Sequence, residues 1–344
     1  MNSFASRLIR WQYTHGRHDL PWQGMDAYRV WLSEIMLQQT QVATVIPYYL
    51  RFIAAFPTVT MLADASEEQV LTYWSGLGYY ARGRNLHMAA QIIIERYDGE
   101  FPRDFAAILA LPGIGRSTAA AICALVWGEH RAILDGNVRR VLARHCGIEG
   151  WAVDKKAEAR LWGQAEALLP PHDVATYTQA LMDLGATVCT RSKPKCTVCP
   201  VQSDCVAFST GRVNELPTPH PRKPVPERHV VMLLLMHGND ILLEKRAPQG
   251  IWGGLWCLPQ FGDEAAAKNW FVQNGMTAHH GERLETFTHN FTHFKLHITP
   301  LKIQLSNKPL RAAQRGSVWL SVEDALSAAI PTPVRQMLKG CCRG

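Results

Sequence analysis

Long apolar runs are missing from this 344-residue sequence. The longest uninterrupted one spans residues 119–127, which is too short to cross a bilayer. Near the N-terminus, Leu8 and Ile9 lie between arginines, and neither the apolar region of a signal peptide nor a small-residue cleavage site follows. The sequence therefore predicts neither a membrane protein nor a secreted one.

A strong local excess of one charge is also missing from most of the chain. The net charge is +7, but residues 1–210 carry 20 Lys and Arg against 19 Asp and Glu, a net of +1. Any nucleic-acid surface in this part must therefore come from the local arrangement of side chains. Apolar residues make up 47% of the chain and charged residues 19%, a balance that excludes the disordered class.

Prolines mark a boundary between two parts of different character. Positions 217, 219, 221, 224 and 226 are proline, and each removes a backbone donor and favours an extended neighbour. We therefore predict a linker over residues 210–229, between a helical domain at 1–209 and a smaller domain at 230–344. The predicted fold class is a multidomain protein with an all-α first domain and an α+β second domain.

The two parts differ in the period of their apolar residues. Residues 30–46 carry apolar side chains mostly three or four positions apart, which predicts one amphipathic helix. Further helices are predicted at 60–75, 84–96, 104–111, 116–127, 137–146 and 154–169. In the second part, residues 230–236 and 241–243 flank a His-Gly-Asn-Asp turn and predict a β-hairpin. The alternation over 291–298 predicts a strand with one apolar face.

Four of the nine cysteines lie in one short segment, at Cys189, Cys196, Cys199 and Cys205. The spacing C-x6-C-x2-C-x5-C is typical of a tetrahedral zinc site or of an iron–sulfur cluster, and it does not separate the two. Disulfides fit poorly with a chain that lacks a signal peptide. The other cysteines are interpreted as ordinary thiols: Cys123, Cys146, Cys257, Cys341 and Cys342.

A glycine-rich turn at residues 111–115 separates two of the predicted helices. Gly113 and Gly115 allow a tight turn whose backbone N–H groups face outward beside a helix N-terminus, which suits a DNA phosphate. Arg116 would add a positive charge to such a site. An ordinary turn between two helices explains the same residues, and this segment alone does not decide between the two.

Two carboxyl groups lie in contrasting settings. Asp135 begins a predicted helix, whose dipole favours the ionised form, whereas burial of Glu34 on its amphipathic helix would raise its pKa. One neutral and one ionised carboxyl group form the arrangement that cleaves glycosidic bonds. The plainer interpretations are a helix cap for Asp135 and a half-exposed helix residue for Glu34, and sequence spacing does not show that the two meet.

Several segments together resemble the MutY family of adenine DNA glycosylases, within the helix-hairpin-helix glycosylase superfamily. They are residues 20–22 (LPW), 31–41 (WLSEIMLQQTQ), 76–80 (GLGYY), 111–119 (LPGIGRSTA), 134–138 (LDGNV), 182–185 (MDLG) and the four-cysteine loop. The order of these motifs, and the glutamate within SEIMLQQTQ, are more specific than any single motif. The resemblance covers nearly the whole chain.

The resemblance implies an enzyme of base excision repair that removes adenine mispaired with 8-oxoguanine or guanine from double-stranded DNA. Glu34 would protonate adenine N7, Asp135 would stabilise the oxocarbenium-like sugar, and Asn137 would help to order the site. Such enzymes flip the target base out of the duplex. The resemblance also implies a [4Fe–4S] cluster on the four cysteines, a monomer without a membrane partner, and a location in the bacterial cytoplasm at the nucleoid.

Other residues match positions that contact the substrate in the family. The adenine pocket would be lined by Arg17, Leu20, Trp22 and Gln179. The DNA would be contacted by Gln39, Thr40, Tyr79, Gly113, Gly115 and Arg116. Ser117 stands where bifunctional relatives carry a lysine nucleophile, and because serine cannot form an imine, the resemblance implies a monofunctional glycosylase with little strand cleavage.

The C-terminal part resembles a Nudix-like domain related to the MutT hydrolase. Residues 251–260 look like the run before a Nudix box, but the paired acidic residues that would hold Mg²⁺ do not follow. Nucleotide hydrolysis is therefore not predicted, and the resemblance implies that the domain recognises 8-oxoguanine through Phe291, Thr292 and His293. Most relatives carry serine at position 292, so threonine keeps the hydroxyl group and adds a methyl group.

Three other functions stay open on the sequence. A thymine or oxidised-pyrimidine glycosylase would lack the C-terminal half of this chain. A non-catalytic damage-binding protein would release no base, although the presence of both Glu34 and Asp135 argues against it. A free-nucleotide hydrolase would act on 8-oxo-dGTP with magnesium, which the missing acidic box disfavours.

Overall fold

A computed structural model describes residues 3–150, 154–219, 224–306 and 316–341. The chain divides into two compact units: Met1–Asp64 with Asn85–Arg222, and Ala65–Arg84 with Lys223–Gly344. The second unit therefore includes residues 65–84, which the sequence analysis placed in the helical domain. Among the described residues, no helix has the length and apolar character needed to cross a membrane.

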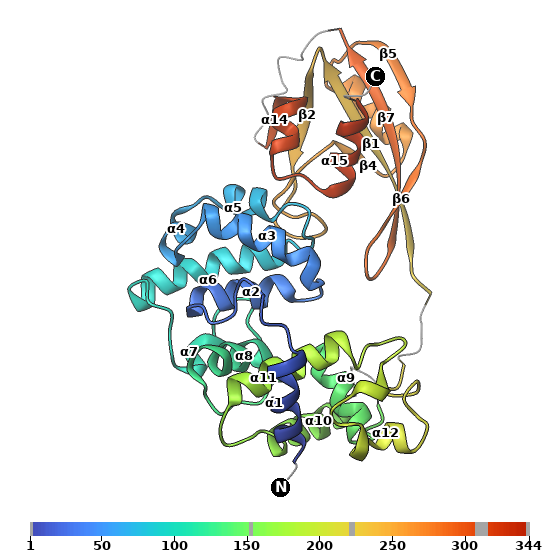
Figure 1. The fold of residues 1–344 in the computed structure, drawn as a ribbon. Helices are drawn as coiled ribbons and strands as arrows, with labels where there is room; N and C mark the ends of the chain where they lie inside the picture. The colour runs from blue at the N-terminus through green and yellow to red at the C-terminus, as the bar shows by residue number, and fades with distance from the viewer. Residues whose placement is uncertain (1–2, 151–153, 220–223, 307–315, 342–344) are drawn as a thin grey trace. The chain divides into compact units, whose positions relative to one another are not determined.

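The first unit is helical (Figure 1). Its helices are α1 (Phe4–His15), α2 (Ala27–Leu37), α3 (Val42–Ala55), α4 (Val59–Asp64), most of α6 (Ala81–Tyr97), α7 (Phe105–Leu109), α8 (Arg116–Trp127), α9 (Gly136–His145), α10 (Lys155–Ala167), α11 (Val174–Thr187) and α12 (Val206–Ser209). Helix α11 packs against α1, α8 and α9. Its buried Leu184 joins Leu142 of α9 and Leu161 of α10 in one apolar core, and this burial is the main force that holds the helices together.

Aspartates start several of these helices. Asp26, Asp104, Asp135 and Asp154 precede α2, α7, α9 and α10, and each side chain accepts a hydrogen bond from a backbone N–H of the first turn. The predicted helices at 84–96, 104–111, 116–127, 137–146 and 154–169 are confirmed to within a few residues.

Two of the predicted helices are wrong as single helices. The predicted helix 30–46 is broken between α2 and α3, because Gln39 adopts a left-handed backbone conformation with φ of 57°. The predicted helix 60–75 is divided into α4 and α5 (Glu67–Trp74). Ser66 starts α5 with a capping box, in which its side chain and that of Gln69 each accept a hydrogen bond from the other residue's backbone N–H.

The second unit contains a mixed β-sheet with helices beside it (Figure 1). Its strands are β1 (Glu227–His237), β2 (Asp240–Lys245), β3 (Trp256–Cys257), β4 (Gln260–Phe261), β5 (Ala278–Arg283), β6 (Phe287–Asn290), β7 (Lys295–Leu305) and β8 (Ser317–Ser321). The order is β3-β2-β1-β7-β5, while β4 pairs with β1, β6 with β7 and β8 with β2. The helices of its C-terminal part are α13 (Glu264–Gln273), α14 (Val322–Ser327) and α15 (Thr332–Cys341).

The register of the long strands fixes which side chains are buried. Strands β1 and β7 run parallel, and Val231, Leu233 and Leu235 share one face of β1 in an apolar core. The predicted hairpin is confirmed, since β1 and β2 pair antiparallel across the turn at 237–240. Strand β1 begins inside the predicted linker 210–229.

The predicted strand 291–298 is wrong at its start. Strand β7 begins only at Lys295, because residues 291–294 form the turn between β6 and β7. The Phe291 N–H donates to the Phe294 carbonyl oxygen at 2.9 Å and closes this turn. The alternation continues beyond it, with Leu296 and Ile298 buried.

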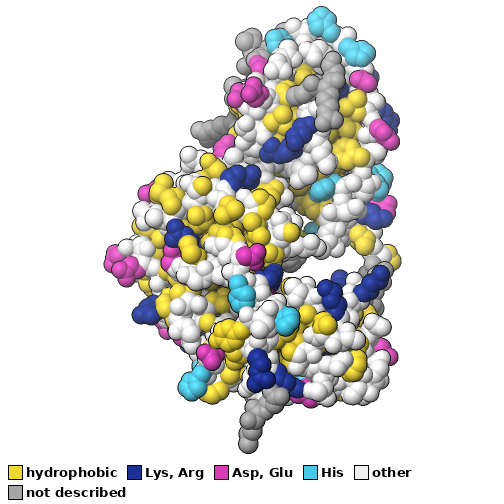
Figure 2. Space-filling model, viewed as in Figure 1, with side chains coloured by type: hydrophobic (Ala, Val, Ile, Leu, Met, Phe, Trp, Pro, Cys, Tyr) yellow, Lys and Arg dark blue, Asp and Glu magenta, His cyan; other side chains and the backbone are white. Residues whose placement is uncertain are grey.

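Charged side chains are mixed on the visible face of the molecule. Figure 2 shows Lys and Arg interspersed with Asp and Glu there. A local basic group does occur beside the cysteines, where Arg191, Lys193 and Lys195 are all exposed. This group is the kind of surface that contacts DNA phosphates.

Candidate functional site

Glu34 lies on α2, among side chains that anchor the helix in the first unit. Trp31, Ile35 and Met36 are at most 2% exposed, so the helix is fixed firmly around the carboxyl group. Glu34 itself keeps some accessible surface but is surrounded by protein atoms. Burial, together with the nearby charge of Asp135, raises the pKa of Glu34 to about 8. Glu34 therefore carries a proton at neutral pH.

Asp135 is the N-cap residue of α9, and its charge acts on Glu34. Burial raises the pKa of Asp135, while the backbone N–H groups of Val138 and Asn137 and the Arg140 guanidinium act in the opposite direction. From the helix N-terminus alone, the sequence predicts a lowered pKa for Asp135. In the structure the pKa is raised instead, because burial has a larger effect than the backbone N–H groups and Arg140. The Val138 N–H donates to Asp135 Oδ1 at 2.7 Å.

The structure thus brings together the two carboxyl groups that the sequence could not connect. Asp135 has backbone donors and a nearby arginine, whereas burial and the Asp135 charge both favour the neutral form of Glu34. Asp135 is therefore the group that ionises first, and Glu34 is the group that keeps its proton. This is the division of roles that cleavage of a glycosidic bond requires.

The turn that carries Asp135 is held from two sides. The Leu134 N–H donates to Ser117 Oγ at 3.0 Å, so Ser117 anchors the turn. On the other side, Arg140 donates to Asn137 Oδ1 at 2.8 Å and to the Gly185 carbonyl oxygen at 2.6 Å. Gly185 is required there, because a Cβ at this position would lie 2.6 Å from the Asn137 Cβ.

Asp183 on α11 is a residue that sequence analysis missed. It is completely buried and accepts hydrogen bonds from Arg17, Gln179 and Gln12, at 2.6 to 3.0 Å. Two of the predicted adenine-pocket residues, Arg17 and Gln179, are therefore fixed by one carboxylate. Asp183 lay within the quoted MDLG segment, but a single helical aspartate gives no sign of burial.

Asp183→Asn is expected to lower the free energy of unfolding by about 2 kcal/mol, because hydrogen bonds from the charged Arg17 are lost or weakened in a buried setting. Urea unfolding of the variant measures this loss. Asp173→Asn is the control, since Asp173 is exposed and precedes α11 without a capping hydrogen bond. An equal loss in both variants would contradict the role of Asp183.

The other predicted pocket residues lie on the segment between α1 and α2. Leu20 and Trp22 are buried, and the Trp22 ring lies 5.2 Å from the Tyr49 ring. Gln23 holds this segment in place, because it accepts from the Leu20 N–H and donates to the Arg17 carbonyl oxygen. The segment therefore links Arg17 and Trp22 in one ordered turn.

The glycine-rich turn connects α7 and α8. Gly113 has φ of 80°, and a Cβ there would approach the Asn85 Cβ to 3.0 Å, so both its conformation and its surroundings favour glycine. Gly115 is the N-cap residue of α8, and because glycine has no side chain, it does not cap the backbone N–H groups of the first turn. Arg116 is turned toward Glu166, 2.6 Å away, and lies 3.8 Å above the Trp162 ring.

The remaining predicted DNA-contact residues are on connecting segments. Gln39 is exposed and Thr40 half-buried between α2 and α3, while the neighbouring Gln38 reaches the Gly113 carbonyl oxygen at 3.4 Å. Tyr79 belongs to the second unit, is 44% exposed and has φ of 49°. Its hydroxyl oxygen lies 3.4 Å from Thr292 Oγ1.

The predicted lesion-reading residues form the turn between β6 and β7. The Phe291 ring stacks on the buried Phe294 ring at 4.5 Å, so Phe291 is fixed from one side. Thr292 and His293 are exposed at the tip. Both side chains are accessible to a ligand from solvent, although the Thr292 hydroxyl also contacts Tyr79 and the His293 ring packs against Phe294.

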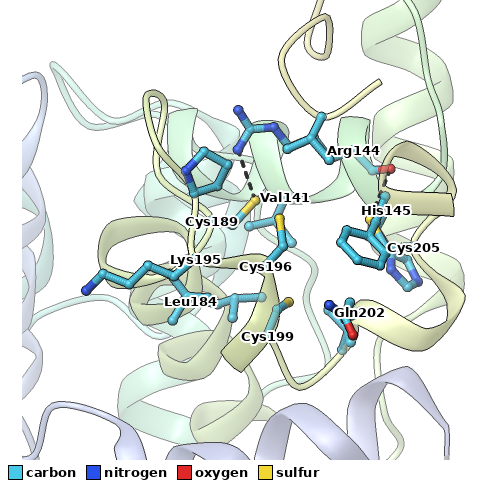
Figure 3. Close-up of a pocket in the computed structure, with 15 residues that line it drawn as sticks. Val141, Arg144, His145, Leu184, Cys189, Lys195, Cys196, Cys199, Gln202 and Cys205 are labelled. Atoms are coloured by element: carbon cyan, nitrogen blue, oxygen red, sulfur yellow. Dashed lines mark hydrogen bonds between the residues drawn. The ribbon is translucent and has the colours of Figure 1, made fainter. Parts of the chain in front are cut away.

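The four clustered cysteines surround one pocket (Figure 3). Cys189 follows α11, Cys196 and Cys199 frame the 3-10 turn η1 (Cys196–Val198), and Cys205 follows the turn η2 (Gln202–Asp204). Burial and the neighbouring thiols raise the pKa of Cys199 to about 11, while the Val201 backbone N–H lowers it. Apolar side chains complete the wall: Val141, Leu184, Val188, Val201, Phe208 and Val213.

Two arginines on α9 join this pocket to its surroundings. Arg144 is 4% exposed and donates to Cys189 Sγ at 3.4 Å and to the Thr190 carbonyl oxygen at 2.7 Å. Arg140 donates to the Cys189 carbonyl oxygen at 2.7 Å, in addition to its contact with Asn137. One guanidinium therefore spans the cysteine loop and the turn of Asp135, a connection that sequence analysis missed because it depends on tertiary structure.

Comparison with known proteins agrees with these features. Residues 32–167 match the family model of the HhH-GPD superfamily base excision DNA repair protein, and residues 230–340 match the NUDIX domain. The adenine DNA glycosylase of Buchnera aphidicola subsp. Acyrthosiphon pisum is 39% identical over 98% of this chain and 97% of its own. That of Homo sapiens is 33% identical over 100% of this chain and 76% of its own.

A solved thermostable thymine-DNA glycosylase is 29% identical, with a TM-score of 0.54, and covers 60% of this chain and 95% of its own. It therefore lacks a counterpart to a large part of the chain. The full-length relatives match both the helical and the NUDIX parts. The chain therefore belongs to the adenine DNA glycosylase family, and it combines an HhH-GPD base excision repair domain with a NUDIX domain.

Proposed function

We propose that the protein is a monofunctional adenine DNA glycosylase that removes adenine opposite 8-oxoguanine or guanine in double-stranded DNA. The observation that carries this proposal is the pair of Glu34 and Asp135: burial and the Asp135 charge raise the pKa of Glu34, while backbone donors and Arg140 act to lower the pKa of Asp135. The target adenine would be flipped out of the duplex to reach the pair.

Each group has a defined part in the proposed reaction. Glu34 gives its proton to adenine N7, the C1′–N9 bond breaks, and the bonding electrons leave with the neutral base. Asp135 stabilises the positive charge that develops on the sugar. Water then adds to C1′, and its proton returns to the Glu34 carboxylate. Ser117 is engaged by the Leu134 N–H and offers no amine, so no imine with the sugar forms.

The four cysteines would hold a [4Fe–4S] cluster. Their four thiols line one largely apolar pocket, and four thiolates on one short loop are the ligand set that such a cluster requires. The exposed Arg191, Lys193 and Lys195 beside it would contact DNA phosphates.

The second unit would read the base opposite the adenine. Tyr79 is exposed on a turn near Thr292, and aromatic stacking onto a base is worth roughly 1–3 kcal/mol. Thr292 and His293 would distinguish 8-oxoguanine from guanine through their polar groups. In this proposal the protein acts as a monomer on chromosomal DNA at the bacterial nucleoid.

Short duplexes that carry adenine opposite 8-oxoguanine, guanine or thymine test the proposal. We expect free adenine from the first two duplexes, and strand breaks only after alkali converts the abasic product. Release of thymine, but no adenine, would favour the other glycosylase class. Duplex binding by the iron-loaded protein without release of any base would leave a damage-binding protein.

A further inference from the structure

Residues 65–84 form part of the second unit, although they lie within the sequence of the helical half. They comprise α5, the turn 76–80 that carries Tyr79, and the start of α6. Polar side chains on this segment bond to residues of the C-terminal part. These bonds determine where Tyr79 lies relative to the turn of residues 291–293.

Ser75 makes the buried part of this connection. Ser75 is only 8% exposed. Its hydroxyl group donates to the Ile330 carbonyl oxygen at 2.9 Å and accepts a hydrogen bond from Arg335 at 3.0 Å. Arg335 also donates to the carbonyl oxygens of Leu326 and Ala328. A buried hydroxyl with both roles satisfied permits only one arrangement of the segments that it joins.

Glu68, two turns earlier on α5, makes a second connection. Its carboxylate accepts from Trp256 Nε1 at 2.6 Å and from Lys245 Nζ at 3.0 Å. Burial acts to raise the pKa of Glu68, but the hydrogen bonds from Trp256 and Lys245 outweigh it and lower the pKa. The contact is thus made by an ionised carboxylate and orients α5 about its axis.

The segment 252–254 completes the path to the reading turn. Arg84 donates to the Gly253 carbonyl oxygen at 2.6 Å, and Gly254 lies so close to α5 that a Cβ would approach Leu71 Cδ1 to 3.2 Å. The buried ring of Trp252 lies 5.5 Å from the Phe291 ring. Contacts therefore run without a gap from α5 to the turn that holds Thr292.

The turn around Tyr79 is itself rigidly joined to α5. Trp74 Nε1 donates to the Gly78 carbonyl oxygen at 3.2 Å, and Arg82 donates to the same oxygen at 3.2 Å. Tyr79 adopts a left-handed conformation at the top of this turn, which turns its ring outward. Any displacement of α5 would therefore displace Tyr79 with it.

We propose that Ser75 and Glu68 are positioning residues that hold Tyr79 and the turn 291–293 in one reading surface, and so set the preference for adenine opposite 8-oxoguanine over adenine opposite guanine. The inference rests on the proposed function, and neither residue touches the reacting atoms. Removal of either side chain loosens one of the two connections, so that Tyr79 and the turn 291–293 are held less firmly relative to each other. The contact to 8-oxoguanine is then weakened, while Glu34 and Asp135 are untouched.

Single-turnover rates of adenine release on the two duplexes test this inference. In Ser75→Ala and in Glu68→Ala, we expect the preference for 8-oxoguanine to fall about tenfold, the size of coupling within one hydrogen-bond network. The rate opposite guanine should stay within about twofold of the parent, whereas a general loss of stability would lower both rates. Glu264→Ala is the control, because it removes an ion pair of similar length, with Arg283 at 2.9 Å.

An unchanged preference in both variants, or an equal fall on both duplexes, would overturn the inference. The affinity of the parent and of each variant for the same duplexes is measured in parallel, because a binding preference can be compared even without turnover. A parent protein that releases no adenine contradicts the proposed function. The positioning inference is then judged by binding alone, and it fails if the variants retain the parent's binding preference or if the parent has none.

Discussion

Glu34→Gln is expected to slow the release of adenine by about a thousandfold, the usual size of a general-acid contribution. The amide has the same shape as the carboxyl group but carries no transferable proton. Affinity for a duplex with adenine opposite 8-oxoguanine should be unchanged. Glu34, in the first unit, is proposed to act in the chemical step, and it is not one of the residues predicted to contact DNA phosphates. Single-turnover release and duplex binding measure the two quantities separately.

Glu95→Gln is the matched control, since Glu95 is an exposed helix glutamate of the same unit. It should leave the rate unchanged. A rate for Glu34→Gln within tenfold of the parent would contradict the role of Glu34 as the acid. Loss of duplex binding in that variant would show that the residue supports the fold or the DNA surface instead.

If the proposed [4Fe–4S] cluster is bound by these cysteines, Cys199→Ala is expected to lose most of the iron and of the visible absorption, because one of the four proposed ligands is removed. The loop 189–205 contributes to the core around α9 and α11, so the melting temperature should fall on the order of 10 °C. Affinity for DNA should fall too, since the basic residues 191–195 lie on this loop. Iron analysis, thermal unfolding and duplex binding measure the three effects.

Cys123→Ala provides the comparison, because Cys123 is a buried thiol of α8 outside the pocket. It should keep its iron and its absorption. Equal iron in the two variants would contradict a cluster on these cysteines. Zinc in place of iron in the parent, after expression with both metals, would show that the loop holds the other metal.

Local signals in the sequence predict much of the fold. The periodicity of residues 116–127 and the aspartate before α9 predict helices correctly, because both are determined by neighbours along the chain. The breaks at Gln39 and Ser66 were missed, since the apolar period continues across them. A residue in the left-handed conformation or a capping box can end one helix and begin another while the spacing of apolar residues along the sequence stays the same.

Contacts between distant residues could not be predicted in the same way. The sequence shows Glu34 and Asp135 but not their proximity, which depends on the packing of α2 against α8 and on the turn anchored by Ser117. Asp183 has no local signal of burial: its partner Arg17 is distant in the sequence, and Gln179 lies one turn earlier on the same helix. Residues 67–75 likewise carry a helical pattern, and this pattern does not reveal the bonds that Glu68 and Ser75 make to Trp256 and Arg335.

The dependence of the adenine-release rate on pH tests most directly whether protonated Glu34 is the acid. Its pKa of about 8 predicts a single-turnover rate that falls about tenfold per pH unit above that value, as the proton is lost. On the acid side the rate should fall again where Asp135 becomes protonated. A rate that continues to rise through pH 8 would contradict the account, because it would show that the ionised form of the group is the active one.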